Sequence, residues 1–164
     1  MVLGLTVCAT LWWAYFDTTA LLGERALAAE PEHHRSRLAR DAYSFLHLPM
    51  VAGIVLLALG LTLVLQHVTV AGHDELLTVT ALYGGVALYL LAHVAFKWRM
   101  VRIVTVSRVV VAVVVLAAVP LTTGLTPLAA LGVLAGVLVT LISYEMIRFA
   151  AARDSVRNSR PTPA

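Results

Sequence analysis

Residues 43–60, YSFLHLPMVAGIVLLALG, decide the fold class of this sequence. From Leu48 to Leu65 no charged residue occurs across 18 positions. A helix that rises ~1.5 Å per residue over that length nearly crosses the ~30 Å hydrocarbon core of a bilayer. The stretch therefore predicts a membrane-spanning helix. It also carries a histidine, His47, at the edge of the apolar run and a proline, Pro49, inside it, which a plain membrane anchor does not need.

The composition of the whole chain favours several such helices. Of 164 residues, 60% are hydrophobic and only 13% are charged, and the mean hydropathy is +0.90. Such a chain has too little polar surface to cover a soluble globule. The net charge of +3 raises the question of nucleic acid, but the Lys and Arg residues lie between apolar segments and form no basic stripe. We therefore expect membrane lipid as the partner and no nucleic acid.

Five apolar segments separated by polar connections predict an all-α integral membrane protein with about five transmembrane helices. We expect a transmembrane domain over residues 1–151 and a disordered cytoplasmic tail over residues 152–164. The helices are expected at residues 2–22, 41–67, 75–96, 103–119 and 127–151.

Prolines mark several of the expected helix boundaries. Pro49 removes a backbone donor inside the second helix and predicts a kink there. Pro120 and Gly124 are expected to end the fourth helix, and Thr126 with Pro127 is typical of the N-cap and first position of a new helix.

The distribution of Lys and Arg predicts the orientation. Four lie in the first connection, three in the turn around Arg99 and four from Arg148 to the C-terminus, whereas the other two connections have none. Under the positive-inside rule the N-terminus is then outside and the C-terminus cytoplasmic. This pattern predicts a multi-pass protein of the plasma membrane.

Five ionisable residues lie inside the expected spans: Asp17, His47, His93, Arg108 and Glu145. Residue counting from the nearest cytoplasmic end places all of them roughly 5 to 9 Å inside the membrane. Charges at that depth are costly unless they face the bundle interior and pair. Two interpretations stay open. The layer forms a path for transport or proton relay, or it is a structural ion-pair clamp whose members bond one another, the backbone or the surface.

Glycines inside the spans predict places where another helix approaches closely, because a helix without a side chain at that point can pack backbone to backbone. Two glycines are adjacent in the third helix and two have GxxxG spacing in the fifth. The candidates are Gly53, Gly60, Gly84, Gly85, Gly132 and Gly136.

Signals for enzymatic chemistry are absent from the sequence. It contains no glycine-rich phosphate loop, nucleophile elbow or paired acid motif, so we expect neither an enzyme nor a cofactor. No metal site is expected either, because the single cysteine, Cys8, excludes a cysteine cluster and the loop histidines lack zinc-site spacing.

Two blocks of the sequence resemble the bacterial low temperature requirement protein A family. The first, W-W-x-Y-F-D, stands here as residues 12–17, and the second, H-x-P-M-x-x-G-I, as residues 47–54; LYLLAHVAFKWRM follows later. The resemblance implies an integral membrane protein and no established biochemical activity. Members are usually longer, with further spans ahead of this region. The resemblance thus implies that a missing N-terminal half, or a second copy of the chain, completes the bundle.

Overall fold

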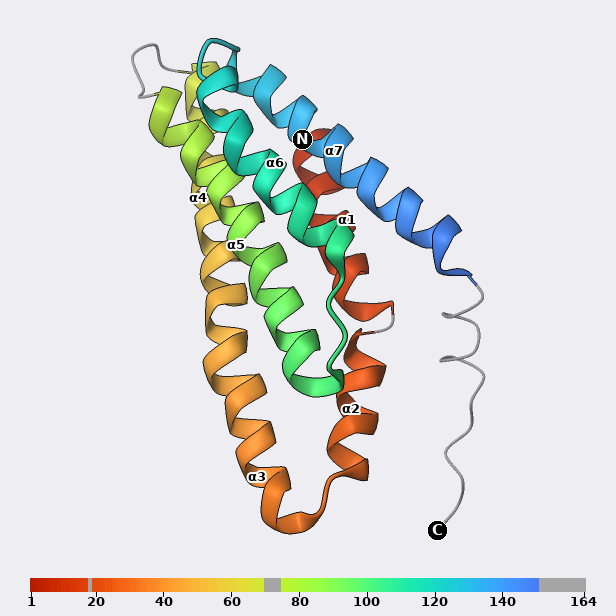
Figure 1. The fold of residues 1–164 in the computed structure, drawn as a ribbon. Helices are drawn as coiled ribbons and strands as arrows, with labels where there is room; N and C mark the ends of the chain where they lie inside the picture. Colours follow the sequence, from red (N-terminus) through yellow and green to blue (C-terminus); the bar gives the residue numbers. More distant parts are fainter. Residues whose placement is uncertain (18, 70–74, 151–164) are drawn as a thin grey trace.

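The computed structural model describes residues 1–17, 19–69 and 75–150, and every regular element within them is helical (Figure 1). This confirms the predicted all-α class for the described residues. The expected tail, 152–164, lies outside them. In chain order the elements are α1 (Val2–Phe16), α2 (Thr19–Ala29), α3 (Glu32–Arg40), the π-helical segment η1 (Asp41–Leu46), α4 (His47–Thr69), α5 (Glu75–Val101), α6 (Val106–Thr122) and α7 (Pro127–Arg148).

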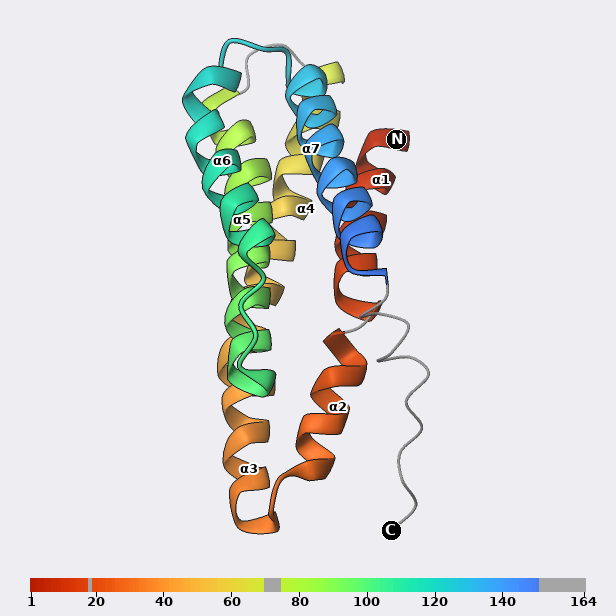
Figure 2. The ribbon, with the colours of Figure 1, turned by 45° about the vertical axis from the view of Figure 1, so that its right-hand side comes forward.

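Helix α5 is the centre of the bundle. It lies between α4 and α6, while α1 and α7 run beside each other on another side of the molecule (Figures 1 and 2). Buried side chains occur along almost all of its length. Two of its tyrosines also bond neighbouring backbones: the Tyr83 hydroxyl donates to the Ala130 carbonyl of α7 and the Tyr89 hydroxyl to the Leu11 carbonyl of α1, both at 2.9 Å. These bonds fix α1 and α7 against the centre.

Glycines allow α4 and α5 to pack backbone to backbone. A Cβ atom added to Gly53 would lie 2.7 Å from the Gly85 carbonyl oxygen, and one added to Gly85 would lie 2.6 Å from the Leu57 nitrogen. A Cβ on Gly60 would lie 2.7 Å from the Leu82 nitrogen. These separations are too short for any side chain, so the contact requires glycine at the three positions.

The other three predicted packing glycines have no such neighbour within the described chain, which corrects that expectation. A Cβ on Gly84 or Gly136 would meet nothing within 4 Å, and one on Gly132 would meet only the Leu3 side chain, at 3.9 Å. Gly84 differs from Gly85 because adjacent residues of a helix point about 100° apart. Gly136 lines a cleft, described below, instead of a helix contact.

The single helix predicted over residues 2–22 is wrong. Helix α1 ends at Phe16, and α2 starts separately at Thr19. The Ala14 carbonyl, in the last turn of α1, accepts a hydrogen bond from Arg108 Nη1 at 3.2 Å. The carbonyls at a helix C-terminus lack partners in their own helix and carry partial negative charge, so a buried guanidinium is a favourable partner for this end.

The predicted polar connection is mostly helical and forms a hairpin of two helices. Helices α2 and α3 meet at Pro31, which is the N-cap of α3, and the hairpin extends beyond the nearby end of α5 (Figure 1). Helix α3 continues through η1 into α4. The second predicted helix, 41–67, therefore starts earlier, at Glu32. A pair between Arg99 and Asp41 at 2.9 Å ties the start of η1 to the end of α5.

The kink expected at Pro49 stays a prediction. The π-helical segment η1 ends at Leu46, three residues before this proline. Pro120 does not end α6 as predicted, since that helix continues to Thr122. Thr126 does begin α7, because its hydroxyl accepts from the Ala129 amide at 3.3 Å. The last three helices differ from their predicted bounds mainly at their ends. They were expected at 75–96, 103–119 and 127–151, and the structure has them at 75–101, 106–122 and 127–148.

Three helical rods within the described residues are long and apolar enough to cross a membrane: Glu32–Gln66, Glu75–Val101 and Pro127–Arg148. Helix α6 is apolar as well but shorter, at 17 residues. Large hydrophobic side chains are exposed along α4, α6 and α7, as expected of helices that face lipid. The number of spans and their orientation stay predictions.

Candidate functional site

A buried ion pair joins α6 to α7. Arg108 lies in the first turn of α6 and Glu145 in the last turn of α7, and because the two helices are antiparallel these residues meet at the same end of the bundle. Arg108 Nη2 lies 2.7 Å from Glu145 Oε2, and Arg108 Nε lies 3.1 Å from both carboxylate oxygens. Arg108 is only 6% exposed. A two-nitrogen contact of this kind is the strong form of an arginine–carboxylate pair.

Side chains of α6 and of other helices complete the hydrogen bonds of this pair. The Ser107 hydroxyl donates to Glu145 Oε1 at 2.8 Å. Arg108 Nη1 lies 3.0 Å from the ring nitrogens of His93, which is fully buried on α5, and Thr19 Oγ1 of α2 lies 2.9 Å from His93 Nε2. A guanidinium only donates, so the His93 nitrogen that bonds Arg108 must carry a lone pair. We call Thr19, His93, Ser107, Arg108 and Glu145 the ion-pair cluster.

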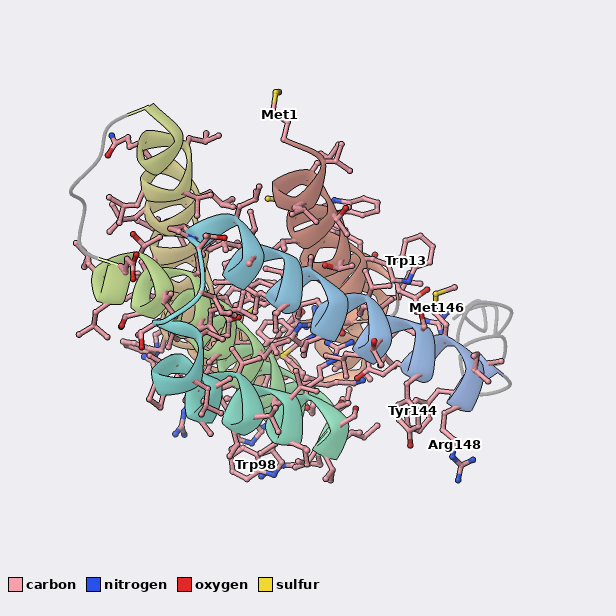
Figure 3. All side chains as sticks on the ribbon, turned by 90° about the horizontal axis from the view of Figure 1, so that it is seen from above. Met1, Trp13, Trp98, Tyr144, Met146 and Arg148 are labelled. Atoms are coloured by element: carbon pink, nitrogen blue, oxygen red, sulfur yellow. The ribbon has the colours of Figure 1, made fainter. Side chains whose placement is uncertain are left out.

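A cleft of about 1160 Å³ borders the ion-pair cluster between α1, α6 and α7. Arg108 and Glu145 line it, together with Asp17 at the end of α1 and Lys97 near the end of α5. The charges of Asp17, Arg108 and Glu145 all act on Lys97. Three of the residues that line the cleft are labelled in Figure 3: Trp13 and Met146 lie on one side of α7, and Tyr144 projects from the other side. Mostly apolar walls with a few charged groups are typical of a binding site.

The structure separates His47 from the other four predicted residues. Its ring lies 5.9 Å from that of Tyr15, 6.4 Å from that of Tyr43 and 6.4 Å from that of Phe96, measured between ring centroids. His47 Nδ1 is buried and has no hydrogen-bond partner within the described part of the chain. The His47 side chain therefore neither joins the ion-pair cluster nor, through Nδ1, bonds the backbone near Pro49. Tyr15 stands between the two histidines, because its ring also lies 5.9 Å from that of His93.

Sequence reasoning missed three polar residues of this region. Lys97 is one of the three cations that the sequence places in the turn around Arg99, yet it follows His93 by four positions on α5, and residues at that spacing share a helix face. That spacing could have revealed it. Ser107 precedes Arg108 and gave no separate signal. Thr19 lies at the start of α2, a helix boundary that the sequence did not predict.

A family model, described as bacterial low temperature requirement A protein, matches residues 1–143 of the chain. The chain belongs to this family. The resemblance predicted from its sequence blocks is thereby confirmed. No curated protein and no solved structure matches the chain.

In this low temperature requirement A protein, the two sequence blocks that carry the resemblance meet in space. Tyr15 of the first block makes an edge contact with His47 of the second. The family match includes Arg108, whereas Glu145 lies just beyond its end. Family membership and the apolar helices together indicate a membrane protein.

Proposed function

We propose that this low temperature requirement A protein is a multi-pass plasma-membrane protein of the transport type, in which the cleft and the ion-pair cluster form a proton path. The observation that carries the proposal is that a large cleft reaches a buried Arg108–Glu145 pair. A purely structural pair needs no access from a cleft. Here the carboxylate is accessible from one side and hydrogen-bonded to the bundle interior on the other.

The membrane arrangement follows from the distribution of positive charge. We place the α2–α3 hairpin and the end of α7 in the cytoplasm and the N-terminus outside, so that the cleft lies near the cytoplasmic side. Helices α1 and α2 then cross the membrane together, as two separate helical parts of one span. Interrupted helices within membranes are tolerated where the irregular backbone is buried in protein or lines a cavity, and they recur in transporters. The end of α1 at Phe16 meets this condition, because the next residue, Asp17, lines the cleft.

The proton path uses groups whose partners can change. A proton that enters the cleft can bind the Glu145 carboxylate, which weakens its attraction for Arg108. The guanidinium keeps two other partners, the Ala14 carbonyl and the His93 ring, so it stays solvated by the protein when the pair opens. His93, bonded on its other side to Thr19, is the next group toward the interior. The pair therefore acts as a gate between the cleft and His93.

Proton flux into liposomes tests this proposal. Purified protein is reconstituted with a pH-sensitive dye inside, and a potassium diffusion potential drives proton movement. We expect flux above that of protein-free liposomes for the wild type, and loss of that excess for Glu145→Gln. Glu75→Gln is the matched control, since Glu75 is the exposed first residue of α5, at the opposite end of the bundle. Wild-type flux equal to that of empty liposomes, or full flux in Glu145→Gln, would contradict the path.

A second function has its own support. Each nitrogen of the Arg108 guanidinium has an acceptor, and Glu145 is bonded by both Arg108 and Ser107. A network that is satisfied within itself also suits a clamp that holds α7 to the bundle. In that case Glu145→Gln lowers thermal stability in detergent but leaves any flux per folded molecule unchanged.

A further inference from the structure

Lys97 is a half-buried cation without a direct partner. Its side chain lines the cleft, but it forms no hydrogen bond or ion pair with any described residue. Arg108, the other cation of the cleft, is already held by Glu145. An ammonium group that is removed from bulk water gains from an anion at its side, and lysine binds phosphate as a point charge. The cleft thus offers one site for an anionic group.

The remaining walls of the cleft are mostly apolar, and several of their side chains face outward. On one side they come from α6 and the segment before it, and on the other from α7: Val104, Val106, Val110, Val133, Val137 and Leu141. Several are well exposed, with Val106 at 64%, Val110 at 53% and Val133 at 46%. In a helix that crosses a bilayer, exposed valines are next to lipid chains. The cleft is therefore continuous with the lipid-facing surface, and a chain can enter it from the membrane.

The cleft is also long. Along α7 it extends from Val133 to Phe149, which at ~1.5 Å per residue is roughly 24 Å. This distance approaches the full thickness of the hydrocarbon core. A compact solute cannot contact both ends of such a cleft, whereas an extended hydrocarbon chain can. Glu145 and Lys97 lie toward the same end, which is near the cytoplasmic boundary in the arrangement proposed above.

We propose that this cleft binds a membrane phospholipid, with its phosphate at the Lys97 ammonium and one acyl chain along the valine walls of α6 and α7. The acyl chain covers the apolar walls on the open side of the cleft, and the phosphate supplies a directly bonded partner, which Lys97 has with none of the described residues. Basic pockets between membrane helices on the cytoplasmic side are suited to lipid headgroups for this reason. Asp17 and Glu145 line the same cleft, so the site carries charges of both signs and selects the phosphate by its position beside Lys97.

The inference goes beyond the proposed proton path, and the two are tested separately. Lipid binding is measured without a proton gradient. A failure of the proton-path proposal therefore does not affect the lipid proposal, and the reverse also holds.

The sequence provides a selective probe, because Lys97 is the single lysine of the chain. Reductive methylation with a ¹³C-labelled reagent keeps the positive charge and labels only Lys97 and the N-terminus. The protein in detergent is titrated with phosphatidylglycerol, and with diacylglycerol of the same chains as the control that lacks the phosphate. We expect a saturable shift of the Lys97 signal with phosphatidylglycerol and none with diacylglycerol. Equal shifts with both, or no shift with phosphatidylglycerol, would overturn the proposal.

Native mass spectrometry of variants gives an independent measurement. Lys97→Gln is expected to lose retained phosphatidylglycerol, whereas Arg99→Gln, which removes a nearby cation that does not line the cleft, is expected to keep it. Equal retention by the two variants would refute the site. Because the titration above uses the wild-type protein, the proposal stays testable even if Lys97→Gln does not fold. Phosphatidylcholine that binds as tightly as phosphatidylglycerol supports recognition of the phosphate alone.

Discussion

Glu145→Gln is the change that tests the buried pair most directly, because it removes the charge and keeps the size of the side chain. Glu145 accepts three hydrogen bonds from Arg108 and one from Ser107. The variant leaves the Arg108 charge uncompensated in a site where Arg108 is 6% exposed.

The expected cost is large for a single change. Breaking a buried pair by removing one partner costs about 3–5 kcal/mol. The Ala14 carbonyl and His93 still solvate the guanidinium, and the glutamine oxygen can accept one bond, so we expect the lower end, about 3 kcal/mol. For a chain of this size that lowers the melting temperature by about 6–12 °C.

The double variant Arg108→Met with Glu145→Met separates pairing from simple loss of contacts. It removes both charges, so its cost is set by the hydrogen bonds that His93 and Ser107 lose, about 1–3 kcal/mol. Each single substitution to Met strands a charge and costs about 3–5 kcal/mol. The double variant is therefore expected to be more stable than either single variant.

Thermal unfolding in detergent, followed by tryptophan fluorescence, measures the four variants against the wild type. A Glu145→Gln effect below about 1 kcal/mol, the value of an exposed pair, would refute the buried pair. So would a double variant whose loss equals the sum of the two single losses. Proton flux in the double variant then distinguishes the two proposed functions. A folded double variant without flux supports the path, and one with full flux supports the clamp.

Two further predictions concern the packing and the helix ends. Gly85→Ala places a methyl group against the backbone of α4 and is expected to cost about 1–3 kcal/mol, whereas Gly84→Ala, with open space beside it, is expected to be neutral or stabilising by up to about 1 kcal/mol. Equal melting temperatures for these two variants would show that α4 and α5 do not approach as closely as described. Thr126→Ala removes the hydroxyl that caps α7 and is expected to cost about 1 kcal/mol in the same unfolding assay, which Thr126→Ser should largely restore.

The level of each ionisable residue along the bundle could be predicted from the sequence. The side of the helix from which its side chain projects could not. Counting residues placed Arg108 and Glu145 at one level, and the structure joins them. The same counting placed His47 at that level, yet its ring points toward Tyr15 and Phe96. Helix α4 is apolar on nearly all sides, so no polar stripe indicates which face is buried. The π-helical segment before it also changes which residues of α3 and α4 share a face, compared with a regular helix. The sequence contains no signal for that change.

Local chemistry was easier to recognise than long-range chemistry. The start of α7 depends on Thr126 and a donor three residues later, so the sequence contains the whole signal. The end of α1 involves the Ala14 carbonyl and Arg108, which are 94 positions apart. The glycines show the same limit. Gly132 and Gly136 do share one helix face, but spacing alone cannot tell whether another helix or a cleft covers that face.

The π-helical segment η1 has a consequence for insertions and deletions. Its hydrogen bonds span five residues instead of four, so it holds more residues per turn than the helices on either side. In a regular α-helix one residue corresponds to a rotation of about 100°. The six residues of this wider turn rotate about as far as five residues of a regular helix. Deletion of one residue from 42–46 would therefore restore a regular helix and is expected to keep Asp41 beside Arg99. The segment thus absorbs one extra residue without changing the direction in which the α2–α3 hairpin presents its arginines.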